Sequence, residues 1–265
     1  MALSVQEIIA RERSAWRKSY LHAGVILAIV AVAFRYTGLF DLHRLSEGVP
    51  SIWSLLGEMT PPDFGNVRQW VKPLFDTLAM SIAGTALCII LSFPLALLAS
   101  QNTSPHPLLY RFARGLLNVL RSIPELIMGI IFVAAVGFGA LPGVLALGFH
   151  SIGMVGKFFA EAIEHVDEGP VEAVRATGAS PMQVIIHGIL PQVYPVMADV
   201  SVYRWEYNFR ASTVMGMVGA GGIGFELMAS LRIMQYREVS AILLVILALV
   251  TVVDGFGAFL RQKFK

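Results

Sequence analysis

The sequence predicts an all-α integral membrane protein, and two observations on its composition support that prediction. Of 265 residues, 56% are hydrophobic and only 14% are charged, whereas about a quarter of the residues of a soluble domain are charged. The apolar residues also lie in long uncharged blocks of about 20 residues, the length that a helix needs to cross a bilayer. The net charge of +2 gives no strong field for nucleic acid, and the single Cys88 excludes an internal disulfide.

About six apolar segments have the properties of transmembrane helices. The clearest, Thr77–Ser100, carries no charge. The block Leu126–Ser151 is interrupted at Gly139–Gly143, which predicts one helix that ends near Phe138 and a second that starts at about Leu141. In chain order the six segments are His22–Phe34, Thr77–Ser100, Leu126–Phe138, Leu141–Phe159, Pro191–Met217 and Ala241–Leu260.

The first segment has a second interpretation as a signal peptide. Basic residues precede it, and Ala31-Val32-Ala33 resembles a cleavage site. The triplet lies inside the apolar run rather than after it, so a retained transmembrane helix is the favoured interpretation.

Basic residues predict the orientation of the chain. Six spans put both termini on one side, and that side collects 12 Lys and Arg residues against 6 on the other. The positive-inside rule therefore makes both termini cytoplasmic. The 12 residues are Arg11, Arg13, Arg17, Lys18, Arg111, Arg114, Arg121, Lys157, Arg175, Arg261, Lys263 and Lys265.

The loop at about 160–191 carries the local signals of two helices joined by an elbow. Pro170 suits the first turn of a helix, and Glu172, expected in that same turn, interacts favourably with the helix dipole. Gly178 comes where such a short helix must stop and can take the left-handed conformation that stops it. Ser180-Pro181 then offers an N-cap and a first position for a new helix. A helix–elbow–helix shape on the cytoplasmic face can project into a groove on a soluble partner.

These residues resemble the EAA loop of ATP-binding-cassette (ABC) importer permeases. In that loop Glu-Ala-Ala is followed by Gly and then by Ile-x-Leu-Pro at fixed spacing. Two positions depart from the pattern: Val174 is the third residue of the triplet, and Gly188 stands where Ile is expected. Gly188 should loosen its helix by roughly 1 kcal/mol relative to Ala. The positions that match are Glu172, Ala173, Gly178, Leu190 and Pro191.

Other strings between about Leu74 and Leu260 look like the phosphonate/phosphite-type permeases within this superfamily. They are Arg121-Ser-Ile-Pro-Glu125-Leu, His150-Ser-Ile-Gly153 and Tyr203-Arg-Trp-Glu-Tyr-Asn-Phe-Arg210-Ala-Ser, continuing through Gly219-Ala-Gly-Gly-Ile-Gly224.

The resemblance implies a type I, MetI-like helical bundle in the bacterial inner membrane. Residues 74–262 would form the permease domain, and residues 1–73 an N-terminal cytoplasmic segment, the first transmembrane helix and an extracytoplasmic segment. The importer would hold two permease subunits, expected to be identical, two ATPases that bind ATP and Mg, and a periplasmic or tethered binding protein. The elbow would dock in a cleft of the ATPase. This chain would be no enzyme, would bind no cofactor or metal, and would pass a small phosphorus oxyanion across the lipid bilayer.

Pro191–Met217 carries charged groups within a predicted span, where they are costly unless they face protein or water. Glu206 and Arg210 are four residues apart and can pair, whereas Arg204 and Asn208 point elsewhere. Two interpretations stay open: the stripe lines the translocation pathway, or internal ion pairs hold this helix against its neighbours or the second subunit. At 100° per residue, one stripe about 80° wide contains Asp199, Tyr203, Glu206, Arg210 and Thr213.

A glycine-rich string follows this span and matches G-x-G-x-x-G literally. Nucleotide binding by that motif needs a preceding strand in a βαβ unit, and the sequence predicts neither. The glycines are instead expected to form a gate or sharp turn above the pathway, as a docking surface for the binding protein or as a loop without that role. They are Gly219, Gly221, Gly222 and Gly224.

Two other classes of function are alternatives to a permease subunit. A secondary transporter of a small anion would need inverted repeats around broken helices and an ion-coupling site, and no convincing repeat is present. A membrane-embedded hydrolase would need an activated nucleophile, and Asp199 and Glu206 have no evident partnering site. No His or Glu cluster has zinc-ligand spacing. The permease subunit of an ABC importer is therefore the predicted function.

Overall fold

The computed structural model describes residues 5–264, although within the first helix the side chains of residues 5–11, 13–15 and 17 are not described. The basic side chains of Arg11, Arg13, Arg17 and Lys265 therefore lie outside the described residues. Every regular element in the described part is helical, as the sequence predicts. The chain divides into two units, Met1–Glu58 and Met59–Lys265.

The first unit contains two helices. In α1 (Val5–Tyr36) the part Lys18–Tyr36 is long and apolar enough to cross a membrane. Helix α2 (Leu42–Glu58) has no buried residue. This helix is not among the predicted segments, although apolar residues recur along one face at helical spacing. They are Leu42, Leu45, Val49, Ile52 and Leu56.

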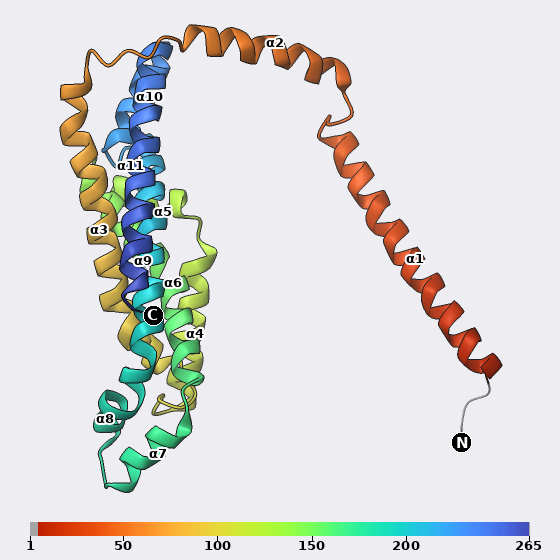
Figure 1. Cartoon of the computed structure of the whole chain (residues 1–265), viewed down its shortest axis with the longest axis vertical. Helices are drawn as coiled ribbons and strands as arrows, with labels where there is room; N and C mark the ends of the chain where they lie inside the picture. Colours follow the sequence, from red (N-terminus) through yellow and green to blue (C-terminus); the bar gives the residue numbers. More distant parts are fainter. Residues whose placement is uncertain (1–4, 265) are drawn as a thin grey trace. The chain divides into compact units, whose positions relative to one another are not determined.

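Four long helices form the framework of the second unit: α3 (Val67–Leu98), α6 (Ala140–Glu164), α9 (Leu190–Met215) and α11 (Tyr236–Gln262). They lie side by side, with α3, α6 and α9 in mutual contact and α11 against α9 (Figure 1). Apolar side chains of α3 and α6 are fully buried between these helices, among them Met80, Leu147, Ile152 and Phe159, and buried polar residues lie beside them.

Two consecutive helices are sharply bent against each other. Helix α4 (Pro107–Ser122) and helix α5 (Glu125–Val136) meet at an angle of 89°. The break follows from Pro124, because the residue before a proline avoids the helical conformation, and Ile123 is extended. Helix α5 corresponds to the predicted span Leu126–Phe138 but is 12 residues long. The described residues 5–264 therefore contain five candidate spans, or six if the bent pair counts as one.

Two short connections mark the ends of the second unit. At one end lie α7 (Glu168–Ala176) and α8 (Pro181–Val184), and a π turn, η1 (Ile185–Ile189), carries the chain from α8 into α9. At the other end a 3-10 turn, η2 (Gly216–Val218), leads to α10 (Ile223–Arg232) (Figure 1). Phe264 packs edge-on against Tyr194, so the end of α11 lies beside the start of α9.

Candidate functional site

The elbow begins with a capped helix. The Asp167 side chain accepts a hydrogen bond from the Gly169 amide at 3.0 Å and caps α7. Because of this cap, α7 starts at Glu168, two residues before Pro170. The expected place of Glu172 in the first turn is therefore wrong: Glu172 lies in the second turn, and Glu168 is the acidic residue in the first.

Gly178 ends α7 in the predicted way. Its φ is +79°, the left-handed region that favours glycine, and its amide donates to the Arg175 carbonyl at 3.0 Å. A Cβ at this position would meet no atom within 4 Å, so the backbone conformation, rather than space, selects glycine. Pro181 opens α8 as predicted, and the Ser180 amide donates to the Gln183 side chain at 2.8 Å.

The first limb of the elbow (α7) and the second limb (α8 with η1) are joined at their base by Gln192, a residue not among the predicted site residues. Gln192, in the first turn of α9, accepts from the Asp167 amide at 2.9 Å and donates to the Asp167 carbonyl at 3.1 Å. It also donates to the Gly188 carbonyl at 2.7 Å. Its position one residue after the Leu-Pro pair was visible in the sequence, but its partner lies 25 residues away.

Gly188 lets the first limb rest on the second. A Cβ there would lie 3.2 Å from the Cα atom of Val171, which is tighter than ordinary van der Waals contact. Val171 is buried and packs in the same core as Val184 and Ile189. The departure from the family pattern at this position thus allows the close approach of α7 to η1.

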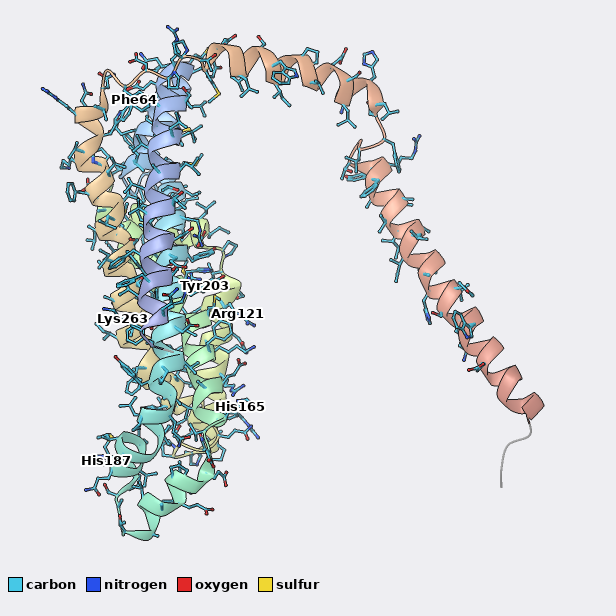
Figure 2. All side chains as sticks on the ribbon, viewed as in Figure 1. Phe64, Arg121, His165, His187, Tyr203 and Lys263 are labelled. Carbon is cyan, nitrogen blue, oxygen red and sulfur yellow. The ribbon has the colours of Figure 1, made fainter. Side chains whose placement is uncertain are left out.

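The elbow exposes the motif residues. Glu172, Ala173, Gly178 and Pro191 are exposed, and Leu190 is half-buried. Figure 2 shows the two limbs, with His165 at the end of α6 and His187 in η1. The elbow therefore presents its motif residues on an exposed helical turn, and the hydrogen bonds of Gln192 hold the two ends of that turn together.

The end of α6 is anchored to the rest of the bundle. Arg114 of α4 donates to both carboxylate oxygens of Glu164, at 2.8 and 2.7 Å, and to the Ala99 carbonyl at 3.0 Å. Glu164 also accepts from the Gln101 amide at 2.9 Å. The carboxylate therefore joins the end of α6, next to the elbow, to α4 and to the turn that follows α3.

The charged residues of the α9 stripe pair with α11. Glu206 forms its ion pair with Arg261, and Arg210 with Asp254, where Nη1 and Oδ1 are 2.7 Å apart. Asp199 lies 3.9 Å from Arg261. The expected Glu206–Arg210 pair is therefore wrong, because each residue has a partner on the neighbouring helix. These contacts favour the interpretation of the stripe as internal ion pairs, and its role in a pathway stays a prediction.

Arg204 and Asn208 point away from α11, as predicted, into the contact of α9 with α3 and α6. Both are buried. Arg204 Nε donates to the Ser151 hydroxyl at 2.7 Å, and that hydroxyl donates to Asn208 Oδ1 at 3.1 Å. The Asn208 amide donates to Thr85 Oγ1 at 2.9 Å.

The glycine-rich string makes the predicted sharp turn at the end opposite the elbow. Gly219, Gly221 and Gly222 have φ values of +98°, +74° and +73°. A Cβ at Gly224 would lie 1.7 Å from the Thr213 carbonyl oxygen. Thr77 of α3 accepts from the Ile223 amide at 2.9 Å and so fixes the start of α10.

Comparison with known proteins gives a consistent result. Residues 92–265 match the family described as "Binding-protein-dependent transport system inner membrane component". The chain is 67% identical, over 250 residues, to the phosphite transport system permease protein PtxC of Stutzerimonas stutzeri, which covers 94% of this chain and 91% of that protein.

Two more distant proteins extend the comparison. The chain is 41% identical to the phosphate-import permease protein PhnE of Mycolicibacterium smegmatis, over 89% of this chain and 43% of that protein. The solved structure of the MetNI methionine ABC transporter in an inward-facing conformation has a TM-score of 0.64 at 22% identity, over 74% of this chain and 96% of the matched chain. That likeness shows that the two chains share a fold.

Proposed function

Because the chain belongs to the inner membrane components of binding-protein-dependent transport systems, we propose that it forms the pathway through which an ABC importer carries phosphite or a closely related phosphorus oxyanion. As the permease subunit it performs no catalysis, and ATP is hydrolysed on a separate subunit. A self-sufficient transporter and a membrane hydrolase do not fit a family that depends on a binding protein.

The substrate proposal is supported chiefly by the 67% identity to a phosphite permease over 94% of the chain. The phosphate-import relative carries an anion of the same chemical class. Phosphite, phosphonates and phosphate share a tetrahedral phosphorus and charged oxygens, so we expect the same groups of the pathway to suit all of them.

Reconstitution tests the substrate. The permease, its ATPase and its binding protein are placed in proteoliposomes, and uptake of radiolabelled phosphite is measured with and without ATP. We expect ATP-dependent accumulation that requires the binding protein and is competed by an excess of unlabelled phosphite. Accumulation of an unrelated solute, with no uptake of any phosphorus oxyanion, would contradict the proposal.

The elbow is the proposed docking element for the ATPase. Its exposed motif residues Glu172, Ala173 and Gly178 protrude, while Gln192 and Glu164 fasten its base. Because the elbow connects α6 to α9, a displacement caused by a soluble partner at the protruding turn can be transmitted to both helices. Pro191 and Leu190 start the helix that would receive this displacement.

Gly178→Asp tests the docking. A non-glycine residue in the left-handed conformation costs about 1–2 kcal/mol, and the side chain would extend into the open space where the partner is proposed to dock. We expect the permease to insert in the membrane at near-normal levels, with coupled uptake abolished and binding of the ATPase lost. Unchanged uptake would refute the docking role.

Gly169→Ala is the matched control for this variant. Gly169 lies in α7, and an added Cβ there would make only an ordinary contact of 3.5 Å with Asp167. This control should retain both insertion and uptake.

The second permease subunit is proposed to be an identical copy, with both termini on the cytoplasmic side. The end of α11 lies beside the start of α9 at the elbow, so an elbow that meets a cytoplasmic ATPase puts the C-terminus in the cytoplasm. The glycine turn at the other end would then face the binding protein as a gate or docking surface. Reporter fusions at the two termini and co-purification of differently tagged copies test these points.

A further inference from the structure

Arg204 is a buried cation without a counter-ion. Its side chain is 2% exposed, yet in the part of the chain that the structure describes it forms no ion pair with a carboxylate. Nε donates to Ser151, Nη1 contacts the Met154 sulfur at 3.3 Å, and the guanidinium lies over the Tyr207 ring at 4.3 Å. The remaining nitrogen, Nη2, is buried and has no hydrogen-bond partner.

An uncompensated buried charge lowers the stability of the folded state, so its presence calls for an explanation. A buried charge without a partner strongly disfavours the folded state, and within a membrane it marks a functional site by default. Among the described residues, Nη2 is therefore a buried donor that no acceptor meets at hydrogen-bond distance.

Glu125 presents the opposite case close by. It is the first residue of α5, after the 89° bend, and its Oε2 atom is buried without a hydrogen-bond partner. That oxygen lies 4.0 Å from His150 Nε2, whereas His150 Nδ1 is already bonded to the Ile123 carbonyl at 3.0 Å. Oε2 of Glu125 is therefore a buried acceptor that no donor of the described residues meets.

The two unsatisfied groups belong to one cluster. Arg204 stacks on Tyr207, and the Tyr207 side chain also interacts with the Glu125 carboxyl. Neighbouring residues of α6 contact both groups: His150 Nε2 lies 4.0 Å from Glu125 Oε2, and Ser151 accepts from Arg204 at 2.7 Å. Tyr203, labelled in Figure 2, is one turn from Tyr207 on α9 and is 48% exposed, whereas Tyr207 is half-buried.

We propose that Arg204 and Glu125 form a transient binding site for a singly protonated phosphorus oxyanion on its way through the permease. Such an anion carries both a charged oxygen, which accepts from Arg204 Nη2, and a P–OH group, which donates to Glu125 Oε2. No covalent step is involved. The inference rests on the proposed function and adds the residues that would meet the substrate.

The carboxylate also explains how such a site can release its ligand. Conduction requires a site that is favourable enough to enter and weak enough to leave. Arg204 attracts the anion, whereas the negative charge of Glu125 opposes it and allows entry only to an anion that brings a proton. A fully deprotonated anion would leave Oε2 without a donor and is therefore disfavoured.

The test uses the complete transporter in proteoliposomes and compares Arg204→Gln, Arg204→Lys and Glu125→Gln with the wild type. Three quantities are measured: phosphite uptake, ATP hydrolysis stimulated by the loaded binding protein, and the midpoint of thermal unfolding. For Arg204→Gln we expect uptake to fall by more than about tenfold while stimulated hydrolysis stays within about twofold, because the anion no longer meets its positive charge.

The other two variants are conservative, so they test the site even if Arg204→Gln does not fold. Arg204→Lys keeps the charge but loses the planar fork of donors, so we expect a several-fold lower ratio of phosphite imported to ATP hydrolysed. Glu125→Gln keeps the shape and one acceptor oxygen, and its ratio should fall less than that of Arg204→Gln. Lys157→Gln, which removes a cation of α6 that is paired with Glu161, is the control and should keep the wild-type ratio.

The outcomes separate the site from the function. Wild-type uptake of phosphite with an unchanged ratio in both Arg204 variants would overturn the site and leave the proposed function standing. Uptake, hydrolysis and unfolding midpoint that fall together in both variants would make Arg204 structural and would also overturn the site. Absence of phosphite uptake by the wild type would overturn the proposed substrate, and the site with it.

Discussion

Helix α9 has two charged faces that use their charges differently. On the α11 face, Glu206 and Arg210 each have an oppositely charged partner on the neighbouring helix. On the inner face, Arg204 is more deeply buried than Arg210 and has hydrogen bonds, but it pairs with no carboxylate of the described residues. The α11 face can therefore hold helices together, whereas the inner face keeps a positive charge available.

The difference shows that burial alone does not reveal the role of a charge. Glu206 is as well buried as many core residues, with a relative exposure of 5%, but its partner Arg261 neutralises it. Arg204 has a similar burial and an unsatisfied nitrogen. Whether a buried charge is structural or functional is decided by its partners, so the two faces should respond differently to substitution.

The largest effect on stability is expected on the inner face, for Asn208→Leu. Asn208 is fully buried and joins the Ser151 and Thr85 hydroxyls. Since each unsatisfied buried polar group costs about 1–3 kcal/mol, we expect the free energy of unfolding in detergent to fall by about 2–4 kcal/mol. Phosphite uptake should fall as well, because Ser151 would no longer be held in place to accept from Arg204.

Thr251→Ala is the control for Asn208→Leu. Thr251 is exposed on α11 and bonds only within its own helix, to the Leu247 carbonyl, so its loss should change stability by less than about 0.5 kcal/mol. Equal effects of the two variants would remove the contrast between the polar interior and the outer surface.

The second largest loss of stability is expected for Gly257→Ala, which fills the space beside Glu206. A Cβ added at Gly257 of α11 would lie 1.8 Å from Glu206 Oε1, so Gly257→Ala must displace the carboxylate or separate the two helices. Overpacking of this kind costs about 1–3 kcal/mol, and thermal unfolding should reveal it. Gly255→Ala, which meets no atom within 4 Å, is the control, and uptake per folded complex should be unchanged in both variants.

Local signals explain what could be predicted from the sequence. The helical architecture follows from uncharged apolar blocks, and the positive φ of Gly178 follows from its place between a short helix and a new N-cap. The predicted start of α7 near Pro170 is too late, because Asp167 caps the helix and α7 begins at Glu168. An Asp just before a helix is a recognisable N-cap, so that signal was available.

Contacts between distant segments could not be predicted in the same way. Glu206 and Arg210 are four residues apart, which suggested a pair, but their partners lie 55 and 44 residues away on α11. The local spacing rule fails because a partner on a packed neighbouring helix competes with one on the same helix. The unsatisfied Arg204 and Glu125 are equally invisible in the sequence, since a missing partner appears only after packing.

A smaller effect is expected for Glu206→Gln, which tests the charge without removing the hydrogen bond. The amide can still accept from Arg261 but cannot neutralise it, so we expect a loss of about 1–2 kcal/mol in the free energy of unfolding. Phosphite uptake per folded complex should stay within about twofold of the wild type, as befits a structural pair. A large loss of uptake at unchanged stability would instead move the pathway to the α11 face.

The smallest effect is expected for the Arg210–Asp254 pair, in which the two side chains are 41% and 45% exposed. Pairs that face water contribute about 0–1 kcal/mol, so if the exposed side of this pair lines a water-filled path, Arg210→Gln and Asp254→Asn should each lower stability by less than about 1 kcal/mol. The double variant should lose less than the sum of the single losses, because a pair once broken cannot be broken again. If Arg210→Gln instead abolished uptake while Arg204→Gln did not, the roles of the two faces would be reversed, and the substrate would have to pass along α11 rather than through the cluster around Tyr207.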